Sequence, residues 1–362
     1  MPPFRLREGG DMGNNGRLST AALLLISSAT VFAQEETEAP DTFAVARPAL
    51  KMPLAPKSIL LDILNTGERL LAVGAYGHIL HSADGTAWTQ VDSPISSMIN
   101  RVRMLDAKTG WAVGHDVSIL KTADGGLSWK LQHFDGKTGR PLYDIYMADA
   151  QRGIAVGSYG LYFTTGDGGA TWTAREFPFT VLSQHLNVLL KLGDGSLFIA
   201  GERGLLVHST DGGETWRLLK PPYTGSFFGA LPYGERGVLL HGLRGSLYAA
   251  DDVAKCPATE PAEYENFDAR RTLTGAAELA PMGFRYFPNE VTESLFGGFW
   301  RSPAQALLVG VNGVVRTVDV AAGTVAGRKS PVEEVLSTAV PYRGRLLAVG
   351  RRGVQDLGVL GE

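Results

Sequence analysis

One line of sequence recurs seven times along this chain of 362 residues. Each copy is a short apolar strand that ends in glycine, followed by two variable residues, usually a second glycine, and another apolar strand. The copies cover residues 70–74, 111–114, 154–157, 197–201, 238–242, 307–310 and 346–350. Their closing glycines are 40, 43, 44, 41, 68 and 40 residues apart, and a further short strand precedes each copy. The chain is therefore built from seven equivalent units, and no long stretch has a helical period.

The length of the unit limits what the seven copies can form. A unit of about 40–45 residues with four short strands is typical of a β-propeller blade. A single blade cannot bury both faces of its sheet, so neighbouring blades must stack around an axis. Runs such as residues 70–73, apolar at every position, suit strands that are covered on both faces. We predict an all-β fold, a seven-bladed β-propeller with four-stranded blades, over residues 42–362.

Two parts of this propeller differ from the regular unit. The seventh unit ends at Glu362 with no room for a fourth strand, so we predict that residues 42–46 complete its sheet and cover the edge. The long interval, about residues 251–292, should hold the fourth strand of blade five and an inserted loop. A loop of this length is either functional or a simple surface insertion, and the sequence leaves its role open. Cys256, the only cysteine in the chain, is interpreted as an incidental free thiol.

The N-terminus has the features of an export signal. Arg17 precedes an uncharged, mainly apolar run that ends in small residues suited to cleavage. We predict a signal peptide over residues 1–33, with Met1 or Met12 as the start, and a short acidic linker over residues 34–41. The mature chain is then expected in the periplasm or an equivalent lumenal compartment, at most peripheral to a membrane.

The composition excludes several classes of function. The chain has 34 basic and 37 acidic side chains, a net charge of −3, which does not suit a general nucleic-acid binder. One cysteine excludes a disulfide framework and a cysteine-based zinc site within one chain. The histidines are scattered, and His78 and His81 fall on opposite faces of one strand. We therefore expect no cofactor, no metal and a monomer.

Four units end in a tighter signature that joins their two outer strands. It begins with serine or threonine, and aspartate follows two positions later. Two glycines come next in three copies, and glycine and threonine in the first copy. Each copy ends with tryptophan. The Asp and Trp residues are Asp84 and Trp88, Asp124 and Trp129, Asp167 and Trp172, and Asp211 and Trp216. Asp can accept hydrogen bonds from the turn's own backbone, Gly takes a positive φ, and Trp buries a large ring. Four equivalent carboxylates around a ring cannot all form one active site, so their role is predicted to be structural.

The signature S/T-x-D-x-G-x-S/T-W resembles that of the Asp-box propellers. Together with the preceding A-V-G-x-x-G, it is similar to the blades of the photosystem II stability/assembly factor family, strongly over residues 59–219 and weakly over the other three blades. The resemblance implies a seven-bladed, non-enzymatic assembly factor that holds a membrane-protein complex or its precursor. It also implies an arginine-rich binding patch.

The variable residues after each conserved glycine are the candidate partner-binding site. The second of them is polar or has a polar tip in every unit, and repeat symmetry places it on a circle near one face of the ring. These residues are Tyr76, Asp116, Tyr159, Arg203, Arg244, Asn312 and Arg352, with His115 and Arg351 beside them. Arg203, Arg244, Arg351 and Arg352 could match the implied patch, because arginine binds carboxylates in a bidentate manner. The alternative is that these turn tips are simply solvated.

Two other functions stay open. Sialidases and some glucanases are glycoside hydrolases that use Asp-box propellers, and such an enzyme needs a pair of carboxylates over the central pocket. The acids best placed for that role are Asp116, Asp144 and Glu202. The third possibility is a generic periplasmic scaffold for a transporter or secretion complex, which would use the same surface with a different partner.

Overall fold

The computed structural model describes residues 45–179, 182–266, 271–328 and 330–360. By its internal contacts the chain divides into residues 1–40 and 41–362. The expected signal peptide and linker therefore lie outside the described residues. Within the described residues, no helix is long and apolar enough to cross a membrane.

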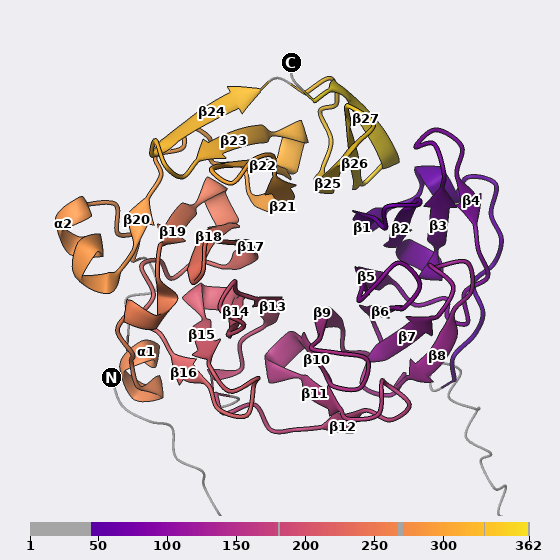
Figure 1. The fold of residues 1–362 in the computed structure, drawn as a ribbon, viewed down its shortest axis with the longest axis horizontal. Coiled ribbons are helices and arrows are strands. Elements are labelled where there is room, and N and C mark those ends of the chain that lie inside the picture. Colours follow the sequence, from indigo (N-terminus) through magenta and orange to yellow (C-terminus); the bar gives the residue numbers. More distant parts are fainter. Residues whose placement is uncertain (1–44, 180–181, 267–270, 329, 361–362) are drawn as a thin grey trace, which may run out of the picture. The chain divides into compact units, whose positions relative to one another are not determined.

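Seven antiparallel sheets stand around an axis and form a seven-bladed β-propeller, which confirms the predicted fold class (Figure 1). Over the described residues, six sheets have four strands and the seventh has three. The innermost strands are β1 (Leu60–Asn65), β5 (Ile99–Met104), β9 (Leu142–Met147), β13 (Leu186–Lys191), β17 (Phe227–Tyr233), β21 (Leu295–Trp300) and β25 (Leu336–Tyr342). The second strands are β2 (Leu70–Gly74), β6 (Gly110–Gly114), β10 (Gly153–Gly157), β14 (Leu197–Gly201), β18 (Gly237–Gly242), β22 (Gln305–Gly310) and β26 (Arg345–Gly350).

The outer two strands complete each blade. The third strands are β3 (Ile79–Ser82), β7 (Ser118–Thr122), β11 (Tyr162–Thr165), β15 (Leu206–Ser209), β19 (Leu247–Ala250), β23 (Val315–Asp319) and β27 (Gly353–Val359). The fourth strands are β4 (Thr89–Gln90), β8 (Lys130–His133), β12 (Thr173–Ala174), β16 (Arg217–Leu218), β20 (Arg285–Tyr286) and β24 (Thr324–Arg328). Apolar side chains of the first three strands fill the spaces between adjacent blades, and five of the seven second strands are buried at every residue.

The long interval after β19 returns to its own blade through β20, which pairs with β19 as the fourth strand of blade five. Before β20 the chain forms two short helices, α1 (Pro261–Glu265) and α2 (Ala276–Leu279), on the outside of the ring (Figure 1). Cys256 lies in this interval and is 1% exposed, within the apolar cluster of blades four and five. Burial raises the pKa of its thiol to about 12, so the side chain is an inert core residue.

Blade seven is closed by packing and not by a shared strand within the described residues. Of residues 42–46, which were predicted to complete its sheet, only Val45 and Ala46 are described, and neither lies in a strand. Ala46 packs instead against the cluster between blades one and two. Val349 of β26 packs against Leu60 of β1, so the first and last blades meet through apolar side chains.

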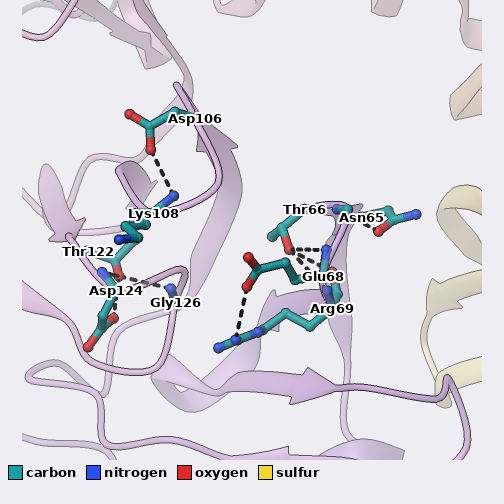
Figure 2. A network of polar contacts seen from close by, with 10 residues as sticks. Asn65, Thr66, Glu68, Arg69, Asp106, Lys108, Thr122, Asp124 and Gly126 are labelled. Carbon is teal, nitrogen blue, oxygen red and sulfur yellow. Dashed lines mark hydrogen bonds and ion pairs between the residues drawn. The ribbon is translucent and has the colours of Figure 1, made fainter.

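The Asp turns after the third strands connect each of the first four blades to the blade before it. In blade two the Asp124 carboxylate accepts hydrogen bonds from the Ser128 N–H at 2.9 Å and the Ser128 hydroxyl at 2.6 Å. The Thr122 hydroxyl donates to Asp124 at 2.8 Å and accepts from the Gly126 N–H at 2.9 Å (Figure 2). Trp129 lies beneath the turn and donates its indole N–H to the Gly126 carbonyl at 3.1 Å. Gly126 has a φ of 87°, and a Cβ there would lie 2.6 Å from the side chain of Leu71 in blade one.

The same contact recurs around the ring. The corresponding glycines Gly169 and Gly213 approach Trp111 and Ile154 of the preceding blades, and Gly85 of blade one approaches Leu347 of blade seven. The Tyr342 hydroxyl of blade seven also donates to the Ala83 carbonyl of blade one at 2.6 Å. The first Asp turn therefore helps to join the two ends of the ring.

Candidate functional site

The turns between the second and third strands place the predicted binding residues on one face. Consecutive antiparallel strands run in opposite directions, so these turns lie at the opposite ends of the sheets from the Asp turns. We call the two sides the glycine-turn face and the Asp-turn face. In blade one, the turn has backbone hydrogen bonds from His78 N–H to the Ala75 carbonyl and from Gly74 N–H to the His78 carbonyl, at 3.0 and 3.1 Å.

Six of the seven predicted positions share one unusual backbone conformation. Their φ values lie between 49° and 59°, in the left-handed region; the residues are Tyr76, Asp116, Tyr159, Arg203, Arg244 and Asn312. In five of these blades a glycine with positive φ follows, which makes a type I′ turn, and in blade two Val117 takes that place. Arg352 is the exception among the seven, because only the glycine after it has a positive φ.

A type I′ turn favours Asn-Gly, the pair found only in blade six. Tyrosine or arginine in the left-handed region costs about 1–2 kcal/mol relative to ordinary backbone. The structure retains this cost in four blades, at Tyr76, Tyr159, Arg203 and Arg244. Strain that recurs at equivalent exposed positions is typical of a ligand-binding surface.

The ring of turn residues has two unlike arcs. Blades four to seven carry the exposed arginines Arg203, Arg244, Arg351 and Arg352, with exposed Asn312 between them. Blades one and three carry the tyrosines Tyr76 and Tyr159, which are 65% and 55% exposed. Blade two lies between the tyrosines and contributes half-buried His115 and Asp116; burial lowers the pKa of His115. The predicted residues thus share one face, with the positive charge confined to one side of it.

The tyrosine arc is partly fixed by its neighbours. The centroid of the Tyr159 ring lies 4.5 Å from that of the His185 ring. The Arg140 guanidinium lies 5.3 Å from the centroid of the Tyr159 ring. Arg140 also donates to the carbonyl of Tyr159 at 3.1 Å. His185 in turn lies 3.7 Å from the Glu202 carboxylate. Asp116 accepts a hydrogen bond from Ser97.

The arginine arc is less constrained. Arg352 forms an ion pair of 2.7 Å with Glu334, whose side chain is 20% exposed. Within the described residues, Arg203, Arg244 and Arg351 form no ion pair. Three guanidiniums are therefore free to donate hydrogen bonds to carboxylates, the groups that arginine binds most strongly.

An inner circle of side chains was not found from the sequence. It consists of the second residue of each innermost strand, and every member is half-buried: Leu61, Asn100, Tyr143, Asn187, Phe228, Phe296 and Ser337. Two of its members, Asn100 and Asn187, donate to backbone carbonyls of the next blade at 2.7 and 2.8 Å. Phe228 and Phe296 of blades five and six lie side by side with ring centroids 5.2 Å apart. Finding this circle requires the register of the innermost strands, which the spacing of the conserved glycines does not provide.

The three acids considered for hydrolysis have separate partners. Asp144 is fully buried and pairs with Arg103 at 3.1 Å and Arg101 at 3.6 Å. It also accepts backbone N–H bonds from Ile145 and Leu189 at 2.9 and 3.1 Å. Asp62 holds Arg101 from the other side at 3.7 Å, and burial raises the pKa of Asp62. Asp144 thus joins the inner strands of blades two, three and four, while Asp116 and Glu202 belong to the glycine-turn face.

Within the described residues no group of three or more His, Cys, Asp or Glu side chains could hold a metal ion.

Comparison with known proteins agrees with this geometry. The model of the family described as photosynthesis system II assembly factor YCF48 matches residues 80–140 and 135–258. A solved structure described as YCF48 bound to D1 peptide has a TM-score of 0.59 and 16% identity, covering 87% of this chain and 99% of that one. YCF48 from Cyanidioschyzon merolae has a TM-score of 0.61 and 16% identity, covering 85% and 98%.

Propellers outside that family share the fold as well. The propeller domain of Cps50 (Swd1) from Myceliophteria thermophila has a TM-score of 0.60 and 11% identity, covering 83% of this chain and 95% of that one. No curated protein matches the chain in sequence. Fold likeness therefore does not single out a family, whereas the sequence model does. Through residues 80–258, which form most of blades one to five, the chain belongs to the photosystem II assembly factor YCF48 family.

Proposed function

We propose that this protein is an exported, non-enzymatic assembly factor that binds an acidic segment of a membrane-protein subunit on its glycine-turn face. The observation that carries the proposal is the set of strained turns that hold arginine and tyrosine outward. A turn selected only for stability would use Asn-Gly at each site, as blade six does. Tyrosine and arginine are also the residues that most often anchor protein interfaces.

The family supports the choice of partner. A relative of the same fold is described as bound to D1 peptide, which makes a polypeptide segment the class of ligand to expect here. The free guanidiniums of Arg203, Arg244 and Arg351 favour carboxylates in that segment. The half-buried pair Phe228 and Phe296, from blades five and six, offers an apolar contact at the glycine-turn end of the innermost strands, the end at which Arg244 lies. An apolar centre with a charged rim is the usual arrangement of a protein interface.

The contacts of the acids favour binding over hydrolysis. Asp144 is fully buried and held by two arginines and two backbone N–H groups, so its carboxylate is not open to a substrate. The proposed location, the periplasm or an equivalent lumenal compartment, follows from the signal-like N-terminus and fits a partner that is assembled at a membrane.

The test is a charge reversal on the arginine arc. Arg203, Arg244 and Arg352 are changed together to Glu, and envelope membranes of the native host are probed by cross-linking to the purified chain. We expect the wild type to cross-link to a membrane-protein subunit or its precursor and the triple variant to lose at least nine-tenths of that product. Its melting temperature should stay within a few degrees of wild type, because these side chains are exposed.

A matched control reverses the same amount of charge on the other face. Lys108, Arg152 and Arg301 are exposed and lie in turns that join first to second strands, at the Asp-turn face. Changing these three to Glu should leave cross-linking intact. Equal loss in both triple variants would refute the glycine-turn face as the binding surface. Cleavage of a soluble glycan by the purified chain would instead favour the hydrolase.

A further inference from the structure

The inserted part of blade five contacts the turn that presents Arg203 in blade four. Residues 257–259 continue the sheet of blade four beyond β16, with Lys220 N–H bonded to the Pro257 carbonyl at 2.9 Å and Thr259 N–H to the Leu218 carbonyl at 3.0 Å. The chain then enters α1, which lies beside blade four in Figure 1. The insertion is thus attached to the neighbouring blade and not only to its own.

Tyr264 of α1 reaches the Arg203 turn directly. Its side chain is 5% exposed and packs into the apolar cluster of blades three and four with Leu205 and Trp216. Its hydroxyl donates to the Arg203 carbonyl at 2.8 Å, with the Glu202 carbonyl at 3.4 Å. This carbonyl belongs to a residue with φ 52° and ψ 30°, so the bond fixes a strained position.

The Arg244 turn is held from two other positions. The Asn289 amide, at the end of the same interval, donates to the Gly245 carbonyl at 3.0 Å, and the Tyr223 hydroxyl donates to the Leu243 carbonyl at 3.1 Å. Tyr223 belongs to the link between blades four and five, which pairs with the insertion through Thr224 N–H and the Arg271 carbonyl at 3.0 Å. One connected segment therefore contacts both turns that carry unpaired arginines in blades four and five.

We propose that the insertion is a positioning element for the arginine arc, with Tyr264 as its positioning residue, so that Arg203 is held ready for an acidic polypeptide. This inference rests on the proposed function. A left-handed residue without such support can relax to ordinary φ, which would turn its side chain away from the arc. A bond to the turn's own carbonyl opposes that relaxation without touching the guanidinium, and therefore leaves the guanidinium free for the partner.

The experiment is a double-mutant cycle on the full mature chain with fluorescein-labelled oligoglutamate as the acidic probe. Tyr264→Phe removes the hydroxyl and keeps the ring in its cluster, whereas Arg203→Ala removes the guanidinium. We expect each single variant to weaken probe binding about three- to tenfold, and the double variant to bind no more weakly than Arg203→Ala, because both changes remove one contact. Hydrogen exchange at residues 202–205 should rise at least tenfold in Tyr264→Phe.

Tyr286→Phe is the matched control. It is the same chemical change in the same interval, and within the described residues the Tyr286 hydroxyl has no hydrogen-bond partner. It should bind the probe and exchange like wild type. Two outcomes would overturn the positioning role. One is a loss of probe affinity in the double variant equal to the product of the two single losses. The other is unchanged hydrogen exchange at residues 202–205 in Tyr264→Phe.

Failure of the proposed function gives a different result. In that case the probe binds the wild type and Arg203→Ala equally, while the exchange measurement still reports whether Tyr264 holds the turn. Probe binding that depends on Arg203 but is unaffected by Tyr264→Phe would instead retain the binding face and reject the inference.

Discussion

At the scale of single residues, the most informative feature is a residue type that does not suit its position in the repeated blade. The turn residues Tyr76, Tyr159, Arg203 and Arg244 occupy a conformation that favours asparagine or glycine. His241 is a second case, because the equivalent residue in the other six blades is valine or alanine. Both departures should be measurable as free energies of unfolding.

Replacing Arg244 by glycine should stabilise the protein while removing a side chain of the proposed binding surface. The left-handed conformation costs arginine about 1–2 kcal/mol, and glycine loses about 0.5–1 kcal/mol more backbone entropy on folding. The free energy of unfolding is therefore expected to rise by about 0.5–1 kcal/mol in urea denaturation. Arg244→Ala removes the same charge but keeps the Cβ, so it should show no such gain. Equal stability of the two variants would mean that the turn stores no strain.

His241 should make stability depend on pH. It is 1% exposed, its Nδ1 lies 3.2 Å from the Leu295 carbonyl, and Gly229 leaves room for its ring. Burial, aided by the positive charge of Arg101, lowers its pKa to about 4. Between pH 6.5 and 4 the unfolded chain binds a proton that the folded chain does not, so stability falls as pH falls, by up to about 3 kcal/mol.

His241→Val should remove that dependence. At pH 7 the variant is expected to lose about 1–2 kcal/mol, because a smaller side chain leaves a cavity. Its free energy of unfolding should then change less than that of wild type between pH 6.5 and 4 in urea titrations. Parallel pH profiles for the two proteins would assign the wild-type dependence to other groups.

At the scale of elements, the Asp turns and the glycine turns use the same few residue types for different ends. An Asp turn satisfies its own backbone and places a glycine against the preceding blade, as Gly126 does against Leu71. A glycine turn leaves its central side chain in solvent. The Asp turn therefore serves packing between blades, whereas the glycine turn holds a side chain in solvent.

Changing Asp167 to Asn should weaken blade three in a way that depends on acid. Hydrogen bonds from the Thr171 hydroxyl and N–H and from Thr165 lower the pKa of Asp167 to about 2. The stabilisation it gives is complete above about pH 4, the pKa of the unfolded chain, and is lost as pH falls towards 2. The melting temperature of the variant should be lower than wild type at pH 5, and the gap should close by pH 2. A constant gap would show that the charge is not involved.

The sequence predicted elements best where two signals coincided. A glycine at the end of an apolar run marked every second strand and the turn after it, because a strand covered on both faces admits apolar residues at each position. The innermost strands carry weaker patterns, interrupted by a bulge such as the one between Leu60 and Asp62. The inner circle with Phe228 and Phe296 therefore escaped prediction. Left-handed turns also escaped, since only φ distinguishes Arg203 from an ordinary turn residue.

At the scale of the whole molecule, the ring has one seam that differs from the other six interfaces. Blade seven has three strands within the described residues, and the Leu357 and Val359 carbonyls of its outer strand are capped by the Arg328 guanidinium of blade six at 2.6 and 3.2 Å. The number of blades followed from counting repeats. How the ring closes did not, because it depends on contacts between residues over 250 positions apart, such as Tyr342 and Ala83.

The seam between blades seven and one should open before the others. It joins the two ends of the propeller without a chain connection, so its opening is opposed only by side-chain packing and a few hydrogen bonds. Hydrogen exchange in β1 and β26 is expected to be faster than in β10 and β14. Leu60→Ala, which removes 0%-exposed apolar surface at the seam, should cost about 2–5 kcal/mol and widen that difference. Equal exchange rates in β1, β26, β10 and β14 would contradict a weak seam.

The opposition of the two faces has a consequence for how proteins of this kind diversify. The glycines that pack blade against blade and the tips that we propose as the binding surface stand at opposite ends of the same strands, so a substitution at a tip leaves the packing contacts unchanged. If the proposed surface is correct, natural variation alters which polypeptide is recognised, one blade at a time, on a scaffold whose architecture stays constant.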